Sequence, residues 1–269
     1  MNKSLIAQLA ILFLITQILG IIVALDFVKT DTKATIVSED TENVSNAFAL
    51  IAYILVFTLI LILAIKYFKG FGLVKVMEIL AVFGTSWIVF DVFIPQISLM
   101  LALLVVGSRI FIKESIFLKN IASVIAVAGA GALLGVSLGV TPVLVFIIAL
   151  AVYDLIAVFK TKHMVFLAKH LSDENLSFTV SMPTKEHLFQ MGTGDLIIPL
   201  VFSVSVLNSV FDGTNLEYAI ILPILLLLGS LVGLLGTLYY TGKQKRALPA
   251  LPMQVVLMLI IYLIGSFVF

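Results

Sequence analysis

Two aspartates in apolar sequence are the residues of this 269-residue chain best suited to do chemistry. Asp154 lies in the run Ala149-Leu-Ala-Val-Tyr-Asp-Leu-Ile-Ala-Val-Phe159, and no basic residue lies within a helical turn of it. Asp195 closes the run Gly192-Thr-Gly-Asp at the start of another apolar segment. A carboxyl group within a membrane-spanning segment is energetically costly, so each aspartate suggests a functional site.

Two carboxyl groups at matched depth on neighbouring helices can share one proton, because two like charges at short range cannot both ionise. One member then draws a proton from water, while the other hydrogen-bonds a substrate carbonyl and helps to protonate a leaving amine. Gly192 and Gly194 have no side chain, so a substrate backbone can approach Asp195 closely. This pattern predicts acid–base hydrolysis of a peptide bond.

Each acid also has a structural interpretation. Asp195 alone could cap a helix, since a carboxylate near a helix N-terminus is favoured by the dipole. Asp154 alone could be a buried acid paired with a basic or hydroxyl group. Glu78 and Asp91 lie nearer the ends of the third span and could snorkel or cap, and Asp26 sits at an interface, so we expect a structural role for all three. The matched depth of Asp154 and Asp195 favours a shared catalytic role for those two.

The composition indicates which elements position these acids. Hydrophobic residues make up 62% of the chain and charged residues 12%, whereas soluble domains average about 45–50% and about 25%. A spanning helix needs about 20 mostly apolar residues. This criterion predicts an all-α polytopic membrane protein with nine transmembrane helices at 5–25, 46–66, 72–91, 94–110, 120–140, 142–160, 192–211, 218–240 and 248–268. The first is too long for a signal peptide, and glycines at four-residue spacing, such as Gly131 and Gly135, indicate close helix packing.

We expect one integral membrane domain over 1–269, with six spans in 1–160, a polar loop at 161–191 and three spans in 192–269. Fourteen of the sixteen lysines and arginines fall on one side of this topology, and only Lys29 and Lys33 on the other. The positive-inside rule therefore predicts a cytoplasmic N-terminus and loop 161–191, with the C-terminus outside. Spans six and seven then run antiparallel. Asp154 lies ~9 Å from the inner end of span six at Lys160, and Asp195 lies ~12 Å past the last charged loop residue, Glu186 or His187. Within the loop, Leu176–Ser181 has the alternation of a short strand.

A proline pair opens the ninth predicted span at the same depth. Pro249-Ala-Leu-Pro252 leaves nearby carbonyls without helical donors. Such backbone is tolerated at membrane depth where it is buried in protein or lines a wet cavity. The sequence therefore predicts a cavity shared by this segment and both aspartates.

Other chemistries find no support in the sequence. The chain has no cysteine, which excludes disulfides, thiolate metal sites and a cysteine nucleophile. His163, His170 and His187 all lie in the polar loop, and no His-Glu-x-x-His motif is present. We therefore expect no metal and no cofactor. The net charge is +1 and no basic-aromatic patch is present, so we also expect no nucleic-acid partner.

Three motifs together resemble the presenilin and signal-peptide-peptidase family of intramembrane aspartyl proteases. They are Tyr153-Asp154 in the sixth span, Gly192-Thr-Gly-Asp195 in the seventh and Pro249-Ala-Leu251 in the ninth. Each is weak alone, but their order and their places in nine spans make the match specific along the whole chain. The resemblance implies a presenilin-like helical bundle around a water-filled catalytic cavity.

The resemblance also assigns roles to residues. It makes Asp154 and Asp195 catalytic, Tyr153, Gly192 and Gly194 supports of the active site, and Pro249, Ala250 and Leu251 substrate-binding residues. It implies transmembrane proteins in the lipid bilayer as substrates. We expect the chain to act alone or as a homo-oligomer, without partner subunits. The strand-like segment near Phe178–Ser181 could pair with an extended substrate, and Thr193 replaces the larger apolar residue common between the two glycines.

Two alternatives remain open from the residues alone. A prepilin-type peptidase also carries a Gly-x-Gly-Asp-like motif, but it predicts neither the Tyr-Asp pair nor Pro-Ala-Leu. A cation-coupled transporter could use paired intramembrane acids. The sequence shows no duplicated halves that would suggest inverted repeats.

Overall fold

The computed structural model describes residues 3–68, 71–112, 114–161, 177–183, 188–211, 216–244 and 249–267. Most of the predicted loop 161–191 lies outside the described residues, including its three histidines, its lysines Lys162, Lys169 and Lys185, and Leu176. The two ends of this loop, which join α6 and α8 to it, are described.

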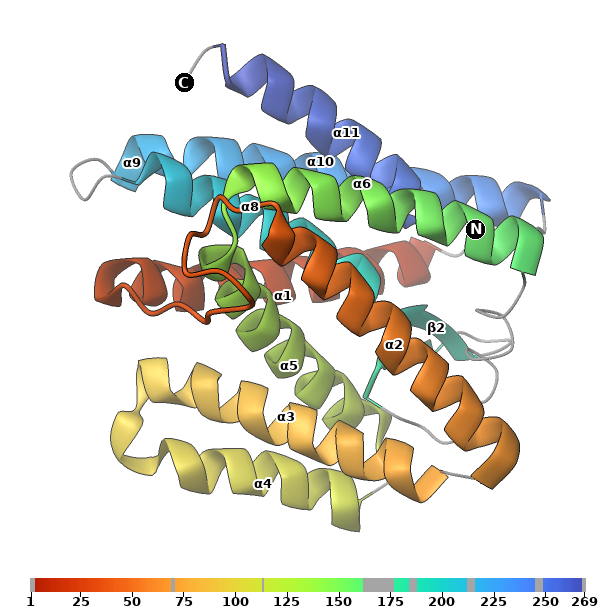
Figure 1. Ribbon diagram of the computed structural model, residues 1–269. Coiled ribbons are helices and arrows are strands. Elements are labelled where there is room, and N and C mark those ends of the chain that lie inside the picture. The colour runs from red at the N-terminus through yellow and green to blue at the C-terminus, as the bar shows by residue number, and fades with distance from the viewer. Residues whose placement is uncertain are drawn as a thin grey trace.

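Helices make up nearly all of the described chain (Figure 1). They are α1 (Lys3–Thr30), α2 (Ser45–Phe68), α3 (Phe71–Phe93), α4 (Ser98–Phe111), α5 (Ile116–Ser137), α6 (Val140–Ile156), α8 (Gly194–Val210), α9 (Leu216–Ala219), α10 (Ile221–Gln244) and α11 (Leu251–Gly265). A 3₁₀ turn at Pro95–Ile97 precedes α4, and a π-helical turn at Ala157–Thr161 continues α6. Every predicted span coincides with a helix to within a few residues.

Six of these helices are long and apolar enough to cross a membrane. They are Ser4–Thr30, Ser45–Leu63, Gly72–Phe93, Ile116–Ser137, Val140–Phe159 and Leu216–Thr241. Three further apolar helices, Pro95–Phe111, Gly194–Val210 and Leu251–Gly265, are shorter. The mostly helical, polytopic membrane fold is therefore confirmed, whereas nine complete crossings stay a prediction.

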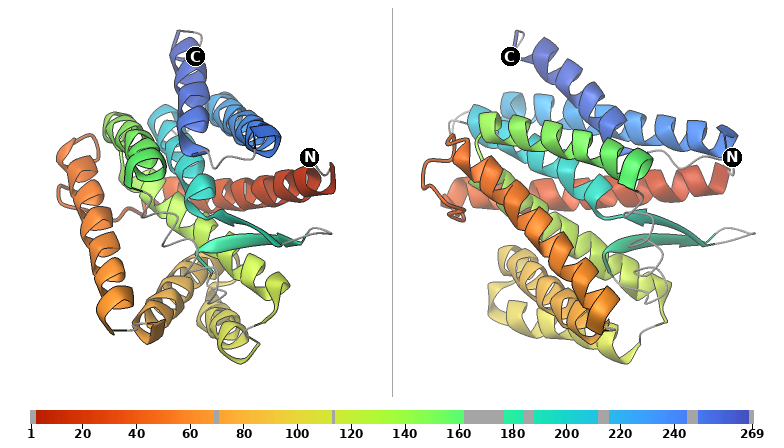
Figure 2. Two further views of the ribbon diagram at one scale, coloured as in Figure 1. Left: turned by 90° about the vertical axis from the view of Figure 1, so that its right-hand side faces the viewer. Right: turned by 45° about the vertical axis from the view of Figure 1, so that its right-hand side comes forward.

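The helix α5 lies at the centre and packs against α1, α3 and α8 (Figures 1 and 2). On one side of it, α3 and α4 form an antiparallel pair; on the other, α6, α10 and α11 gather around α8. α2 crosses obliquely and contacts both α6 and α3. Many large apolar side chains, for example Leu59 and Leu103, face outward, as suits helices surrounded by lipid.

Glycines set the close packing of α5 on α8, as the sequence predicts. An added Cβ would lie 2.6 Å from the Leu200 side chain at Gly131 and 2.5 Å from Val204 Cβ at Gly135. Gly20 of α1 faces Leu200 in the same way, at 2.3 Å. The helix that carries Asp195 in its first turn, α8, therefore packs tightly against α1 and α5.

The loop before α2 fixes the start of α6. The Glu42 carboxylate accepts hydrogen bonds from the backbone N–H groups of Val140 (3.0 Å) and Thr141 (3.2 Å). A carboxylate at a helix N-terminus satisfies orphan donors and complements the dipole. This contact fixes the end of α6 opposite Asp154.

A β-hairpin precedes α8. Strands β1 (Thr179–Pro183) and β2 (Leu188–Gly192) pair antiparallel, with Ser181 opposite Gln190. The predicted strand at 176–181 is therefore placed too early, because Ser177 and Phe178 form a turn. The turn is held by hydrogen bonds to Glu78 and Arg109, which the local sequence does not reveal.

Candidate active site

Asp154 lies in the last turn of α6 and is half-buried. The apolar residues around it form an uninterrupted helix, which changes to a π-helical turn three residues later, at Ala157. Such turns are often found at functional sites. Tyr153 is also half-buried, and its phenol group and the Asp154 carboxylate interact electrostatically.

Asp195 lies in the first turn of α8 and is half-buried. The N-cap residue of this helix is Thr193, not Asp195, so the capping interpretation of Asp195 does not hold. The Thr193 hydroxyl does not cap the helix; it donates to the Phe178 carbonyl (3.0 Å), which also accepts from the Thr193 N–H (3.1 Å). The helix start that carries Asp195 is thus joined to the base of the hairpin.

The first turn of α8 also receives support from α1. Pro199 lies inside α8 and cannot donate to the Asp195 carbonyl, so this turn lacks one helical hydrogen bond. The buried Gln17 amide donates to the neighbouring carbonyl of Leu196 (2.9 Å). A polar side chain from a distant helix therefore stabilises the backbone next to Asp195.

The fold brings the two aspartates together. Their carboxylates are close enough for their charges to interact. Their helices pack against each other and against α11, and Ala151, Ile198 and Leu251 share one buried apolar cluster beside them. The matched depth predicted from the sequence corresponds to this proximity.

The Pro249-Ala-Leu251 segment meets both aspartate-bearing helices. The Leu251 backbone N–H donates to the Asp154 carboxylate. Ala250 packs against an apolar cluster that includes Leu196, the residue after Asp195. Pro249 lines an adjacent cavity. The three residues thus lie next to the helices that carry the aspartates.

Internal packing does not account for the glycines beside Asp195. A Cβ added at Gly194 would meet no described atom within 4 Å, and at Gly192 the nearest would be the Gly194 nitrogen at 4.0 Å. Neither has the positive φ that favours glycine. Among the described residues, none fills the space beside this backbone.

A cavity of about 490 Å³ lies between the end of α6, α10 and α11, and Leu155, the residue after Asp154, is part of its wall. Its lining is mainly apolar: Leu155, Phe159, Gly236, Thr237, Tyr240, Pro249, Pro252, Met253 and Val256. The volume is within the range of small-molecule sites and exceeds that of one apolar side chain.

Two of the three other candidate acids, Asp91 and Glu78, have side-chain partners. Asp91 accepts a hydrogen bond from the Ser98 hydroxyl (3.1 Å), as a residue near a helix end is expected to do. Glu78 does not snorkel to the interface; its side chain is 1% exposed and forms ion pairs with Lys75 and Arg109. Asp26 is half-buried towards the end of α1. None of the contacts described for these three acids involves Asp154 or Asp195.

Sequence reasoning missed several parts of this site. The strand β2 was not predicted, because it is short and includes a glycine. The hydrogen bond from Leu251 to Asp154 was not predicted either, because it uses a backbone N–H, which every residue except proline supplies. Gln17 could have been singled out as a polar residue in the middle of an apolar span. Its partner lies 179 residues away, so its role needed the structure.

These features define a helical membrane protein with a paired-aspartate site next to a β-hairpin. The chain matches the family described as signal-peptide peptidase, presenilin aspartyl protease, over residues 10–269. It therefore belongs to this family, and it is an aspartic protease of the intramembrane class. The match decides against the prepilin-type peptidase and the transporter.

Solved structures support the fold. Two crystal structures of a presenilin family intramembrane aspartate protease, in space groups C222 and P2, are similar to this chain with TM-scores of 0.67 and 0.69. Their sequences are 23% and 24% identical to it, and in both cases 96% of each chain is covered. No curated protein sequence matches the chain.

Proposed function

We propose that this chain hydrolyses peptide bonds within membrane-spanning segments of other proteins, with Asp154 and Asp195 as the catalytic pair. The observation that carries the proposal is that the two carboxylates lie close enough for their charges to interact, with the Leu251 N–H bound to Asp154. Asp154, near the end of α6, and Asp195, at the start of α8, are both half-buried, and no described residue fills the space beside Gly192 and Gly194.

In the proposed mechanism the pair holds one proton. The ionised aspartate accepts a proton from a water molecule as its oxygen attacks the scissile carbonyl carbon, and the protonated aspartate hydrogen-bonds the carbonyl oxygen. The pair then returns a proton to the departing amine. The Leu251 N–H orients the Asp154 carboxyl group by engaging one of its oxygens, and the other stays available to water.

We further propose that an extended substrate pairs with β2, not with β1. The backbone N–H and C=O of Ser181 bond to the Asn120 side chain, so these groups point away from β2. Alternation along an antiparallel pair then directs the backbone groups of Leu188, Gln190 and Gly192 towards the opposite edge of β2. Among the described residues, no further strand pairs there. A substrate strand added at this edge would lead directly to Asp195.

The cavity between α6, α10 and α11 supports a preference for apolar substrate side chains next to the cut bond. Leu155, the residue after Asp154, forms part of the cavity wall. Pro249, two residues before Leu251, forms another part of it. A leucine or phenylalanine of a transmembrane substrate would gain about 1.5–3 kcal/mol from complete burial relative to water. Peptide bonds flanked by such residues are the proposed targets.

We propose that all nine apolar helices, including the three shorter ones, lie at membrane depth. The N-terminus and loop 161–191 are then cytoplasmic, with the C-terminus outside. The site is built from one chain, so we propose that it acts without partner subunits, alone or as a homo-oligomer. Its substrates are transmembrane proteins in the same bilayer.

The test is cleavage of a purified single-span test peptide with an apolar core, with the enzyme in liposomes. Asp154→Asn and Asp195→Asn keep side-chain volume and remove the ionisable group. Each is expected to lower kcat/KM by about 10²–10⁴-fold, the usual contribution of a general acid or base. Mass spectrometry of the products locates the cut.

Asp91→Asn is the matched control, because Asp91 is also an intramembrane aspartate with a hydrogen-bonding role. It is expected to cleave at the wild-type rate. Wild-type activity in either Asp154→Asn or Asp195→Asn would refute the two-aspartate mechanism.

A further inference from the structure

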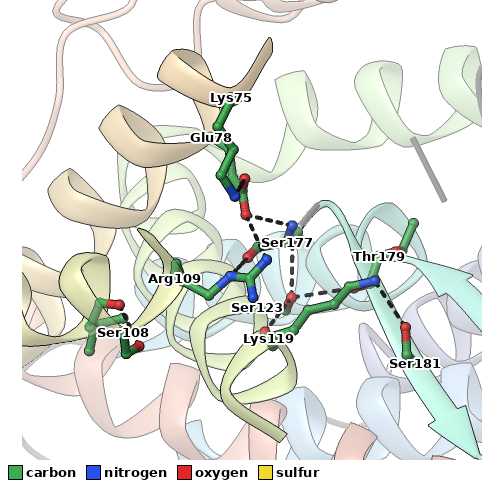
Figure 3. Close-up of polar contacts among 10 residues, drawn as sticks. Lys75, Glu78, Ser108, Arg109, Lys119, Ser123, Ser177, Thr179 and Ser181 are labelled. Atoms are coloured by element: carbon green, nitrogen blue, oxygen red, sulfur yellow. Dashed lines mark hydrogen bonds and ion pairs between the residues drawn. The ribbon is translucent and has the colours of Figure 1, made fainter. Parts of the chain in front are cut away.

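A buried group of charged side chains lies where the ends of α3, α4 and α5 meet (Figure 3). Glu78 of α3 forms ion pairs with Lys75 and with Arg109 of α4 (3.4 Å for the second). The side chains of Glu78 and Arg109 are 1% and 2% exposed, and Lys119 of α5 is completely buried. Burying such charges costs several kcal/mol per ion, even when they are paired.

These charges hold the hairpin as well as one another. The Ser177 N–H donates to Glu78 (2.8 Å), and Arg109 Nε donates to the Ser177 hydroxyl (2.9 Å). Lys119 Nζ donates to the Ser181 hydroxyl (2.9 Å). Figure 3 shows these side chains converging from three helices on the segment that enters β1.

Asn120 holds β1 in the manner of a neighbouring strand. Its amide accepts from the Ser181 N–H (2.9 Å) and donates to the Ser181 carbonyl (2.7 Å). One turn later on α5, the Ser123 hydroxyl donates to the Ser177 carbonyl (2.8 Å). α5 thereby fixes the position of β1 along its own axis.

The hold on β1 extends to Asp195 through a few bonds. Phe178, between Ser177 and β1, accepts from both the N–H and the hydroxyl of Thr193. Asp195 follows two residues later, and β2 is fixed by its register with β1. The edge of β2 and the Asp195 carboxyl group are therefore positioned by one set of contacts.

A role in helix packing alone does not explain this arrangement. Apolar side chains such as Val82, Val106 and Ala122 already pack α3, α4 and α5 together. Replacing a buried ion pair by apolar residues is often neutral or stabilising, so buried pairs are weak stabilisers. The polar contacts made by Asn120 and Lys119 go to the hairpin, which a packing role does not require.

We propose that Asn120 is a positioning residue which, with Lys119 and the Glu78–Arg109 pair, fixes the register of a bound substrate relative to Asp195. Asn120 would thus help to determine which peptide bond of the substrate is cut. This inference rests on the proposed function, because it assumes that an extended substrate pairs with β2. None of these side chains needs to touch the reacting atoms.

The test compares wild type, Asn120→Leu and Asn120→Asp on one single-span peptide, with products identified by mass spectrometry. Leucine is close to asparagine in size and removes both bonds to Ser181, whereas aspartate keeps the acceptor for the Ser181 N–H. For Asn120→Leu we expect kcat/KM to fall about tenfold, since two hydrogen bonds are lost. One dominant cut should become several neighbouring cuts, with Asn120→Asp intermediate.

Asn208→Leu is the matched control, because Asn208 also binds a backbone carbonyl, that of Val136, but at the other end of α8. It should keep the wild-type pattern of products. A loss of folded enzyme lowers the total rate without changing where the peptide is cut, so the pattern reports positioning separately from stability.

An unchanged pattern of cuts in Asn120→Leu, at any total rate, would overturn the positioning role. If that variant does not fold, an unchanged pattern in Asn120→Asp has the same meaning. Cleavage that persists in Asp154→Asn would overturn the proposed function itself, so the two failures are distinguishable.

Discussion

Thr193 shows how one residue can join two parts of the site. It lies between the two glycines and is the N-cap residue of α8, yet its hydroxyl binds the Phe178 carbonyl at the base of the hairpin. In the sequence, this threonine stands where a larger apolar residue is common in the family, and the residue type alone leaves substrate preference open. The structure adds a structural link to Asp195, two residues away.

Thr193→Val is expected to lower kcat about three- to tenfold, because valine keeps the shape of threonine and removes one hydrogen bond. Thr193→Ser, which keeps the hydroxyl, should restore most of the activity. Steady-state kinetics on a single-span peptide measure both. Thr85→Val removes a comparable hydroxyl from α3, away from the hairpin, and should have no effect. Equal activity in Thr193→Val and Thr193→Ser would show that the hydroxyl does not contribute.

At the scale of residues, the sequence identifies side chains that are energetically costly in an apolar span, but it does not identify contacts between residues far apart in the chain. Asp154 and Asp195 stand out because carboxyl groups are rare in apolar spans. Glu78 was expected near an interface because it lies towards a span end, but its partner Arg109 is 31 residues away and closes a buried ion pair. The Leu251 contact with Asp154 is made by backbone, which leaves no mark in the sequence.

At the scale of elements, the bilayer makes helices predictable. A span of fixed thickness requires a long apolar run, so the helix positions follow from composition along the chain. The hairpin is harder to predict: each strand has five residues, and β1 is held by side chains of α5 rather than by its own pattern. The spacing of glycines on α5 predicts close packing, and the structure identifies α8 as the partner.

Gly135→Ala is expected to destabilise the protein by about 1–3 kcal/mol, the usual cost of overpacking. The new methyl group would lie 2.5 Å from Val204 Cβ and 2.9 Å from the Val201 carbonyl oxygen, and a backbone atom cannot rotate away. Thermal unfolding in detergent measures the change. Gly84→Ala is the control, because a Cβ there meets nothing within 4 Å. Alanine in a helix interior should leave stability equal or slightly higher. A similar effect of both substitutions would contradict the close contact between α5 and α8.

At the scale of the whole molecule, charge is distributed unevenly. The structure places Lys75, Arg109 and Lys119 close together at the hairpin end of the bundle, as expected for connections on one side of the membrane. The fold itself does not distinguish the cytoplasmic side from the outside. The positive-inside rule predicts which side is cytoplasmic, and in the orientation we propose from it the aspartate pair lies nearer the cytoplasmic face.

The absence of cysteine allows a direct test of orientation. Thr35→Cys introduces an exposed thiol in the loop between α1 and α2, and Glu114→Cys introduces one between α4 and α5. A membrane-impermeant maleimide should label Thr35→Cys in intact cells and Glu114→Cys only after permeabilisation. The reverse pattern would invert the proposed topology and place loop 161–191 outside.

The hydrogen bond from Gln17 to Leu196 has a consequence for biosynthesis. Its donor and acceptor are separated by 179 residues. At roughly 5–20 residues per second, synthesis of the intervening chain takes about 10–40 s. During that interval α1 is in the membrane without the carbonyl that its amide binds in the finished protein. A temporary partner for the Gln17 amide, such as water, lipid or the insertion machinery, is therefore part of how this enzyme is made.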